Sequence, residues 1–360
     1  MRIVIKIVGK IVCKNVMKNT MPAFSILVPT FNHERFINDC IRSVINQTFP
    51  DWEMIILDDG SNDNTGSLAS EWAKSDPRIT YVYQPNKGIF SLFETNNHGL
   101  ELSAGKYVSI LEGDDFWEKD KLQKQFDALE THPEVVLCWG KVRAFSSETG
   151  KVHTVLPRMS EHIPISWTNN PVGSILNDLI LDNFIPSVTI SIRKSSLLEI
   201  GGFQQLEGFP ATDLPTVLKL ATRGQFYFCN DILANYRIQS NQITKVFTIQ
   251  MLDKRILFIR RFIESLPAVL RSQITLDAKT IDRHFKKTKL ITFVVSGRHK
   301  LIRKEFGEAR NDFMKAVFYP SSLLPAWRLS AISGMIFSLF HCDMERFLRF
   351  FGKTRYKAGN

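Results

Sequence analysis

The sequence predicts an α/β fold in which a mixed, mainly parallel central sheet is flanked by helices and followed by a helical C-terminal extension. Two observations predict the sheet. From Phe24 onward, short runs rich in Ile, Val and Tyr alternate with segments of helical period, and polar turns follow these runs. A third observation predicts the extension, because after about Lys245 the chain becomes dense in Phe, Ile, Leu, Lys and Arg, with little strand pattern.

The elements are expected as repeated strand and helix units. Ser25–Pro29 is the first predicted strand, apolar residues at helical spacing between Ile37 and Ile45 predict a helix, and Trp52–Leu57 is the next strand. Further strands are predicted at residues 79–83, 107–111, 135–142 and 188–192, and further helices at residues 65–74, 91–102 and 213–222.

Three segments are expected along the chain: a basic leader or short amphipathic helix at residues 1–22, the α/β domain at 23–245, and a helical, basic region at 246–360. The first segment has a lysine at every fourth position from Lys6 to Lys18, but it lacks the uninterrupted apolar core of a signal peptide. Five widely spaced cysteines form no C-x-x-C pair. We therefore expect a cytoplasmic protein.

A formal net charge of +10 favours an anionic partner, which leaves nucleic acid, a phosphate-bearing substrate and an anionic lipid surface open. No nucleic-acid partner is expected, because the sequence has no helix-turn-helix pattern and no aromatic and basic RNA motif. The eight histidines lack the spacing of a zinc site. Residues 99–106 lack the glycine spacing of a phosphate loop.

Acidic residues follow two of the predicted strands. Asp58 and Asp59 follow the second strand, and Glu112, Asp114 and Asp115 follow the strand at 107–111. Ligands of open α/β sheets bind at the carboxyl ends of the strands. A single acidic turn is usually a solvated loop, but two acidic strand ends in one sheet favour a ligand site.

Several motifs occur in a fixed order over the first two thirds of the chain. They include SILVPTFN at 25–32, LDDGSND at 57–63 and EGDDFW at 112–117, together with residues 43–48, 86–88, 97, 104–107, 201–203, 213–214 and 236–237. In this order and spacing, the region from Phe24 to Thr244 resembles the family 2 glycosyltransferases of the GT-A fold. The resemblance implies a Rossmann-like nucleotide-sugar domain and an inverting transfer of sugar from a nucleotide diphosphate donor, by preference a UDP-sugar.

The resemblance also implies which residues bind the donor. The loop of Pro29, Thr30 and Asn32 and the pair Asp58 and Asp59 match the nucleotide-binding motifs, and Asn86 belongs to the next matching motif. A carboxylate accepts paired hydrogen bonds from a uracil imide or from ribose hydroxyls. The alternative for Asp58 is that it caps the following turn.

Glu112 and Asp114 stand where the family has its D-x-D motif, so Asp114 is implied as the ligand of Mg²⁺ or Mn²⁺. A hard divalent cation on a carboxylate stabilises a leaving diphosphate. Glu112, where the family more often has Asp, is expected to reach the donor ribose or the metal. Asp115 is expected to contribute to donor binding from behind the residues that contact the donor, or to face the acceptor. Trp117 is expected either to stack on the acceptor sugar or to pack in the core.

Asp213 matches the catalytic base of the family, and an inverting transfer needs one carboxylate to take the proton of the acceptor hydroxyl. Thr212 replaces the glutamate that usually precedes this residue, and helix capping is the alternative role of Asp213. Arg237 is a candidate for balancing the donor charge, unless it forms only a surface salt bridge. Gln239 stands where many relatives have His.

A glycan or lipid-linked acceptor in the synthesis of bacterial surface polysaccharide is the partner that the resemblance implies. Two alternatives remain: a sugar nucleotidyltransferase, which lacks support because residues 25–32 contain no glycine-rich phosphate loop, and a noncatalytic nucleotide-sugar or glycan binding module. Peripheral contact with the inner face of the cell membrane is expected from the C-terminal segment. The uncharged apolar run between Arg328 and Asp343 is too short to span a bilayer, and three phenylalanines set among basic residues follow it.

Overall fold

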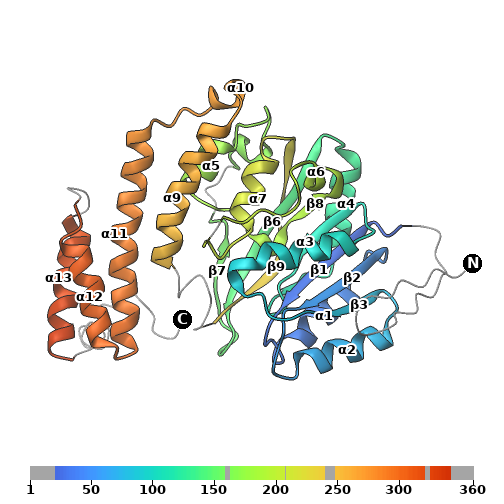
Figure 1. The fold of residues 1–360 in the computed structure, drawn as a ribbon, viewed down its shortest axis with the longest axis horizontal. Helices are drawn as coiled ribbons and strands as arrows, with labels where there is room; N and C mark the ends of the chain where they lie inside the picture. The colour runs from blue at the N-terminus through green and yellow to red at the C-terminus, as the bar shows by residue number, and fades with distance from the viewer. Residues whose placement is uncertain (1–20, 159–162, 207, 240–247, 321–324, 342–360) are drawn as a thin grey trace, which may run out of the picture.

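The computed structural model describes residues 21–158, 163–206, 208–239, 248–320 and 325–341. The expected leader at 1–22 lies almost wholly outside these residues, and so does the basic and aromatic segment at 342–360. The described part of the chain consists of one α/β sheet with its covering helices and of a helical C-terminal region, which lies at the end of the molecule away from β1 to β3 (Figure 1).

The sheet has nine strands in the order β3-β2-β1-β4-β8-β6-β9-β5, and β7 pairs with β6. β1, β2, β3 and β4 are parallel, as are β6 and β9, whereas β8, β5 and β7 pair antiparallel with their neighbours. The predicted mixed and mainly parallel sheet is therefore confirmed. The strands are β1 Phe24–Thr30, β2 Trp52–Asp58, β3 Ile79–Tyr83, β4 Tyr107–Ile110, β5 Phe116–Trp117, β6 Val135–Ser146, β7 Val152–Leu156, β8 Ser191–Arg193 and β9 Gln225–Ile238.

Helices cover both faces of this sheet because alternate residues of its strands are apolar on both sides. Ile26 and Val28 of β1 pack with α1, α2 and α4, whereas Leu27 packs in the core that holds α3, α5, α6, α7 and α9. The helices are α1 Ile37–Ile45, α2 Thr65–Ser75, α3 Leu92–Leu102, α4 Lys121–Thr131, α5 Leu176–Leu181, α6 Lys194–Glu199, α7 Asp213–Leu220, α9 Thr248–Ser265, α10 Ala268–Arg271, α11 Ala278–Ile302, α12 Phe306–Val317 and α13 Pro325–Leu339.

One predicted strand begins later than expected. Residues 188–192 were predicted as a strand, but Ser187–Thr189 form a 3₁₀ turn and β8 begins at Ser191. Pro186 precedes the turn, and the Thr189 hydroxyl donates to the carbonyl oxygen of Pro186 over 2.8 Å. This side-chain bond favours a turn over an extended strand.

The helical C-terminal region does not pack as a separate body from residue 246. Leu252, Ile259 and Phe262 of α9 and Phe285 of α11 belong to the same core as α5 and α7. A separate cluster, built around Phe313, joins the second half of α11 to α12 and α13. The break between the two cores therefore falls inside α11, and not at the boundary near residue 245 that the change in composition suggested.

A lysine is fully buried beneath the sheet. Lys121 is 0% exposed, and its ammonium group donates to Gln125 Oε1 over 2.6 Å and to Ser191 Oγ over 3.3 Å. It lies 3.9 Å from the centre of the Trp117 ring. Burial lowers the pKa of Lys121 from 10.5 to about 7, although the nearby Cys138 and Cys229 act to raise it.

This burial predicts a pH-dependent stability. Between about pH 7 and pH 10 an unfolded lysine binds a proton that folded Lys121 does not, so its contribution to the free energy of unfolding rises with pH, by up to about 1.4 kcal/mol per pH unit. Lys121→Met should remove this contribution. In urea titrations at pH 7 and pH 9, the variant should be more stable than the original at pH 7, and the difference should shrink at pH 9. Lys124→Met, on the same helix but partly exposed, is the control; a Lys121→Met difference that is independent of pH would contradict the assignment.

Candidate active site

Three loops meet at the carboxyl edge of the parallel strands, after β1, β2 and β3. The Thr30 carbonyl oxygen accepts from the Asp59 backbone amide over 2.9 Å, and the exposed Asn32 has a positive φ of 55°. The Asn32 side-chain oxygen accepts a hydrogen bond from the Asn62 backbone amide over 3.0 Å. The Asn32 backbone amide donates to Ser61 Oγ over 2.9 Å. These bonds join the loops into one surface, as expected for a nucleotide-binding edge.

Asp59 and Asn86 lie on this surface and organise the loop after β3. Both Asp59 carboxylate oxygens accept backbone amides, from Lys87 over 3.0 Å and from Gly88 over 3.1 Å. Asn86 Nδ2 donates to the Asp59 carbonyl oxygen over 2.7 Å. Gly60, at φ +77°, allows the close approach, because a Cβ there would lie 2.7 Å from the Asn86 nitrogen.

Asp58, in contrast, is not placed to touch a donor. It is 0% exposed, its Oδ1 accepts from the Ser61 amide over 2.8 Å, and its Oδ2 accepts from the Tyr81 hydroxyl over 2.7 Å. Burial, followed by this bond, raises the pKa of Tyr81. The alternative role, capping the turn that carries Asp59, therefore accounts for the hydrogen bonds of Asp58 in this structure.

Pro29 and Thr30 are buried, and their carbonyl oxygens join the end of β1 to neighbouring loops. The Pro29 carbonyl oxygen accepts from the Gly113 amide over 3.2 Å, which ties the end of β1 to the acidic loop after β4. A Cβ at Gly113 would lie 2.5 Å from Thr30 Oγ1, so this approach requires glycine. The two acidic strand ends predicted from the sequence are thus joined through the end of β1.

Glu112 carries an unusual carboxyl group. Its Oε1 accepts from the Ser187 hydroxyl over 3.2 Å, whereas its Oε2 is buried with no hydrogen-bond partner in the described part of the chain. Burial, together with the carboxylates of Asp114 and Asp213, raises the pKa of Glu112 to about 7. Glu112 therefore lies within electrostatic reach of Asp114, the predicted metal ligand, and of Asp213, the predicted base.

Asp114 is partly exposed, and its Oδ2 accepts from Gln239 Nε2 over 2.8 Å. Among the residues that the structure describes, no group of three or more His, Cys, Asp or Glu side chains is arranged to hold a metal ion. Such a group is not required for Mg²⁺, which proteins often bind through one or two carboxylates with substrate phosphates and water completing the shell. The partly exposed Asp114 carboxylate and the unpartnered Glu112 Oε2 fit that kind of site.

Asp115 and Arg237 belong to the interior. Asp115 is 2% exposed, and its Oδ1 accepts from the Arg237 amide over 2.8 Å. Burial raises the pKa of Asp115 well above its usual range, and Asp114 and Glu112 add to the effect. The Arg237 guanidinium pairs with Asp39 over 2.5 Å and lies 5.0 to 5.3 Å from the Phe36, Phe116 and Phe145 rings. An ion pair between the largely buried Arg237 side chain and the half-exposed Asp39 therefore accounts for Arg237, and the expected donor contacts of Asp115 and Arg237 stay predictions.

Asp213 is the first residue of α7. Its Oδ2 accepts from Asn183 Nδ2 over 2.5 Å. The segment that supplies Asn183 also supplies Ser187, which bonds Glu112, so residues 183–187 join Asp213 to the acidic loop. Thr212, the residue before α7, makes no side-chain capping bond; its hydroxyl accepts from Asn96 Nδ2 over 3.2 Å.

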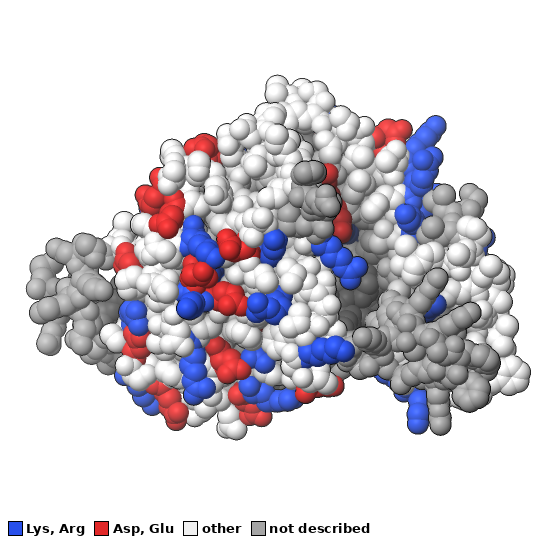
Figure 2. All heavy atoms as spheres, turned by 180° about the vertical axis from the view of Figure 1, so that it is seen from behind, with Lys and Arg blue, Asp and Glu red and all other residues white. Residues whose placement is uncertain are grey.

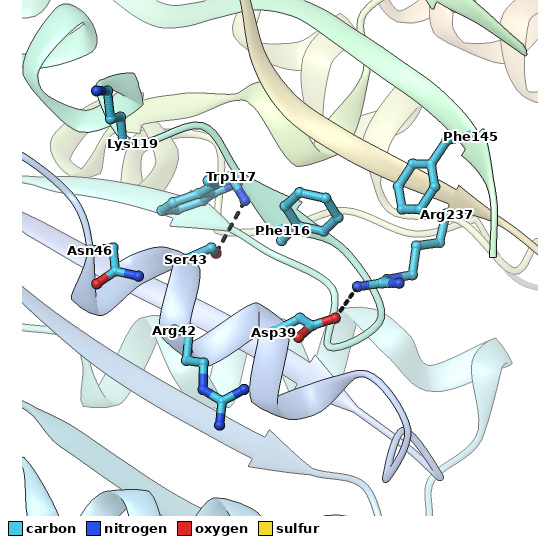
Figure 3. A pocket seen from close by; sticks show the side chains of 9 residues that line it. All are labelled: Asp39, Arg42, Ser43, Asn46, Phe116, Trp117, Lys119, Phe145 and Arg237. Carbon is cyan, nitrogen blue, oxygen red and sulfur yellow. Dashed lines mark hydrogen bonds and ion pairs between the residues drawn. The ribbon is translucent and has the colours of Figure 1, made fainter. Parts of the chain in front are cut away.

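Trp117 is 3% exposed, and its indole nitrogen donates to the Val188 carbonyl oxygen over 2.8 Å. Packing therefore accounts for Trp117 better than stacking on an acceptor. Figure 3 shows its place beside a groove of about 520 Å³ between α1 and β5, where Asp39 points towards Arg237. Glu112, Asp114 and Asp213 do not line this groove, which is thus separate from the acidic site.

Sequence reasoning missed Asn183, Ser187 and Arg255. Asn183 and Ser187 lie outside every motif, and nothing in their local pattern distinguishes them from loop residues. Arg255 had a usable signal, since a basic residue interrupts the apolar face that Leu252, Ile256 and Ile259 form on α9.

Comparisons with known proteins agree with the geometry. The model of the family "Glycosyl transferase family 2" matches residues 25–193. The putative teichuronic acid biosynthesis glycosyltransferase TuaG of Bacillus subtilis (strain 168) is 32% identical over 227 residues, which cover 62% of this chain and 82% of TuaG. The chondroitin synthase of Escherichia coli is 37% identical over 107 residues, which cover 30% of this chain and 15% of that enzyme.

Solved structures resemble the whole described fold. S. aureus TarS 1–349 in complex with UDP has a TM-score of 0.54 at 18% identity, covering 92% of this chain and 93% of that one. The mannosyltransferase PcManGT from Pyrobaculum calidifontis, in complex with GDP-Man and Mn²⁺, has a TM-score of 0.53 at 15% identity, covering 89% and 88%.

The fold is of the GT-A class, with a helical C-terminal region. More specifically, the chain belongs to glycosyltransferase family 2 and is a glycosyltransferase.

Proposed function

We propose that this enzyme transfers a sugar, with inversion, from a UDP-sugar to a hydroxyl of a glycan or lipid-linked acceptor in the synthesis of a cell-surface polysaccharide. One observation carries the proposal: residues 183–187 link Asp213 to Glu112 and the acidic loop, so a candidate base stands beside the candidate metal and donor site. Relatives and neighbours named for teichuronic acid biosynthesis and for UDP complexes support the polymer and the donor.

The proposed mechanism uses a single displacement. Asp213, held at Oδ2 by Asn183, takes the proton of the acceptor hydroxyl as that oxygen attacks the anomeric carbon from the side opposite the diphosphate. One carboxylate suffices, since no covalent intermediate forms and the configuration inverts. Thr212 bonds Asn96 and takes no part in the proton transfer.

The donor is assigned to the edge formed by the loops after β1, β2 and β3. The side chains of Asn32, Asp59 and Asn86 are exposed or partly exposed there and can bond a base or ribose. The buried residues Asp58, Pro29 and Thr30 hold the loops of this edge in place through hydrogen bonds to their backbone amides. A divalent cation, Mg²⁺ or Mn²⁺, would be held by Asp114 with Glu112 beside it, and when bound it would stabilise the charge of the leaving diphosphate.

A panel of nucleotide sugars, each with and without Mg²⁺ or Mn²⁺, tests the proposal directly. Slow hydrolysis of one UDP-sugar is expected, and NMR of the sugar released should show inverted anomeric configuration. Hydrolysis would exclude a noncatalytic binding module. Retained configuration would contradict the single displacement, and turnover of no nucleotide sugar would contradict the proposed function.

Peripheral membrane contact is proposed from the outer face of α13. Leu329, Ile336, Leu339 and Phe340 are between 46% and 73% exposed, whereas the small residues Ala331, Gly334 and Ser338 pack inward. Among the described residues, no helix is both long and apolar enough to cross a membrane. In Figure 2, uncharged atoms and scattered Lys and Arg side chains are visible at the right-hand end, where α12 and α13 lie. Such a face suits an interfacial position, and the net charge of +10 suits anionic lipid.

The double variant Leu329→Glu/Ile336→Glu should therefore bind phosphatidylglycerol vesicles at least about tenfold more weakly, because each side chain contributes about 1.5–3 kcal/mol when buried. Vesicle sedimentation at low and moderate salt measures this. Ile165→Glu, at another exposed isoleucine, should bind as the original does. Equal binding of the double variant and this control would show that α13 does not dock.

A further inference from the structure

Helix α9 brings an arginine from the C-terminal region to the acidic site. Arg255 Nη2 donates to the Leu179 carbonyl oxygen over 3.3 Å, and its Nη1 lies 3.9 Å from Asp182 Oδ1. The guanidinium lies 5.6 Å from the centre of the Phe285 ring of α11. Asp182 immediately precedes Asn183, which holds the proposed base, so Arg255 stands behind the same segment that organises Asp213.

The charge of Arg255 is poorly compensated within the described part of the chain. Its side chain is only 15% exposed, and its Nε is buried without a hydrogen-bond partner there. Asp182 is 79% exposed at a distance of 3.9 Å, which makes a weak, solvent-screened pair. A buried arginine is costly unless hydrogen bonds satisfy its donors. This guanidinium therefore retains donors for an incoming anion.

Asp213 interacts electrostatically with charged groups on both neighbouring elements. The carboxylates of Asp114 and Asp213 both act on Glu112. Burial lowers the pKa of Arg255, while the carboxylates of Asp182 and Asp213 oppose this shift. Arg255, which contacts the segment that ends at Asn183, is therefore close enough to the proposed base to act on its charge.

We propose that Arg255 binds an anionic group of the acceptor, close to the hydroxyl that Asp213 deprotonates. The inference rests on the proposed function and specifies its acceptor. A planar guanidinium suits a carboxylate or a phosphate, to which it donates two parallel hydrogen bonds. Both possible ligands present an oxyanion close to the reacting hydroxyl. It is supplied either by an acidic sugar or by the phosphate of a lipid carrier.

Ligand-observed NMR with saturating UDP and Mg²⁺, which occupy the donor side, can test this. The probes are methyl β-D-glucuronide for a sugar carboxylate, glucose 1-phosphate for a phosphate, and methyl β-D-glucoside as the neutral analogue. At least one anionic probe should bind, and the neutral probe should bind at least about tenfold more weakly, given the strength of charge-assisted hydrogen bonds. The anionic probe that binds identifies the source of the oxyanion.

Arg255→Gln should weaken binding of the anionic probe about ten- to a hundredfold. Arg255→Lys should weaken it less, because lysine retains the positive charge but cannot donate two parallel hydrogen bonds. Both variants should retain the affinity for UDP and the original low rate of UDP-sugar hydrolysis. Arg261→Gln, at an exposed position of the same helix, is the control. Thermal melting verifies that each variant is folded.

Unchanged anion binding in folded Arg255→Gln, an equal loss in Arg261→Gln, or no anionic probe binding to the original enzyme would overturn the inference. If Arg255→Gln does not fold, the Arg255→Lys comparison decides in the same way. Absence of UDP binding and hydrolysis in the original enzyme would instead overturn the proposed function, so the two failures are distinguishable.

Discussion

Asp213→Asn is expected to lower the rate of sugar transfer by about a hundredfold to ten-thousandfold, the usual effect of removing a positioned general base. An amide cannot take the proton of the acceptor hydroxyl, but it matches the carboxylate in size and can still accept the bond from Asn183. Affinity for UDP should remain near normal, because Asn32, Asp59 and Asn86 lie on loops that Asp213 does not hold. The effect should therefore appear in kcat, with little change in donor KM.

Single-turnover kinetics and UDP titration on the same preparation make this measurement. Asp231→Asn is a matched control, since Asp231 is 53% exposed and pairs only with Lys124 in the described structure. An Asp213→Asn protein that unfolds or loses UDP would identify Asp213 as structural. Near-normal transfer by the folded variant would mean that the base lies elsewhere, and Glu112, whose Oε2 is unpartnered, would be tested next.

Asp114→Asn should lower transfer at least about a thousandfold, because stabilisation of the leaving diphosphate by a cation is worth several kcal/mol and each 1.4 kcal/mol is about tenfold in rate. The substitution removes the negative charge that holds Mg²⁺ or Mn²⁺. A readout independent of turnover is available: UDP affinity by calorimetry should rise when Mn²⁺ is added to the original enzyme and should not rise in Asp114→Asn.

Asp231→Asn should respond to Mn²⁺ as the original enzyme does. Two results would reject Asp114 as the metal ligand: a Mn²⁺-dependent gain in UDP affinity that persists in Asp114→Asn, or full activity of the original enzyme in excess chelator. Because the Gln239 amide contacts Asp114, Gln239→Ala should have a far smaller effect on the response to Mn²⁺ than Asp114→Asn.

The order of strands and helices could be predicted because it depends on local pattern. Apolar runs and helical spacing predicted β1 to β4 and α1 to α3 closely, and acidic residues after β2 and β4 indicated the edge where ligands bind. β8 was predicted less well, since the Thr189 bond that turns the chain there is a specific side-chain contact and not a pattern.

The roles of individual site residues depended on partners distant in sequence. Asp58 and Asp59 are neighbours with the same side chain, yet Asp58 is buried and bonded to Tyr81, whereas Asp59 is partly exposed. Arg237 is paired by Asp39, which lies 198 residues earlier in the chain. Asn183 meets Asp213 only once α5 and α7 are packed. Such pairings are set by tertiary packing, which no motif contains.

The shared core of α9 and α7 limits how this enzyme can be recombined with its relatives. An exchange of the C-terminal half at residue 245 would cut through a core that also supports the helix carrying Asp213, and Leu252, Ile259 and Phe262 would meet foreign neighbours. A junction within α11 after Phe285 follows the natural break in packing. The part of the chain that packs together with the helix carrying Asp213 therefore extends about forty residues beyond the glycosyltransferase motifs, and Arg255 lies inside it.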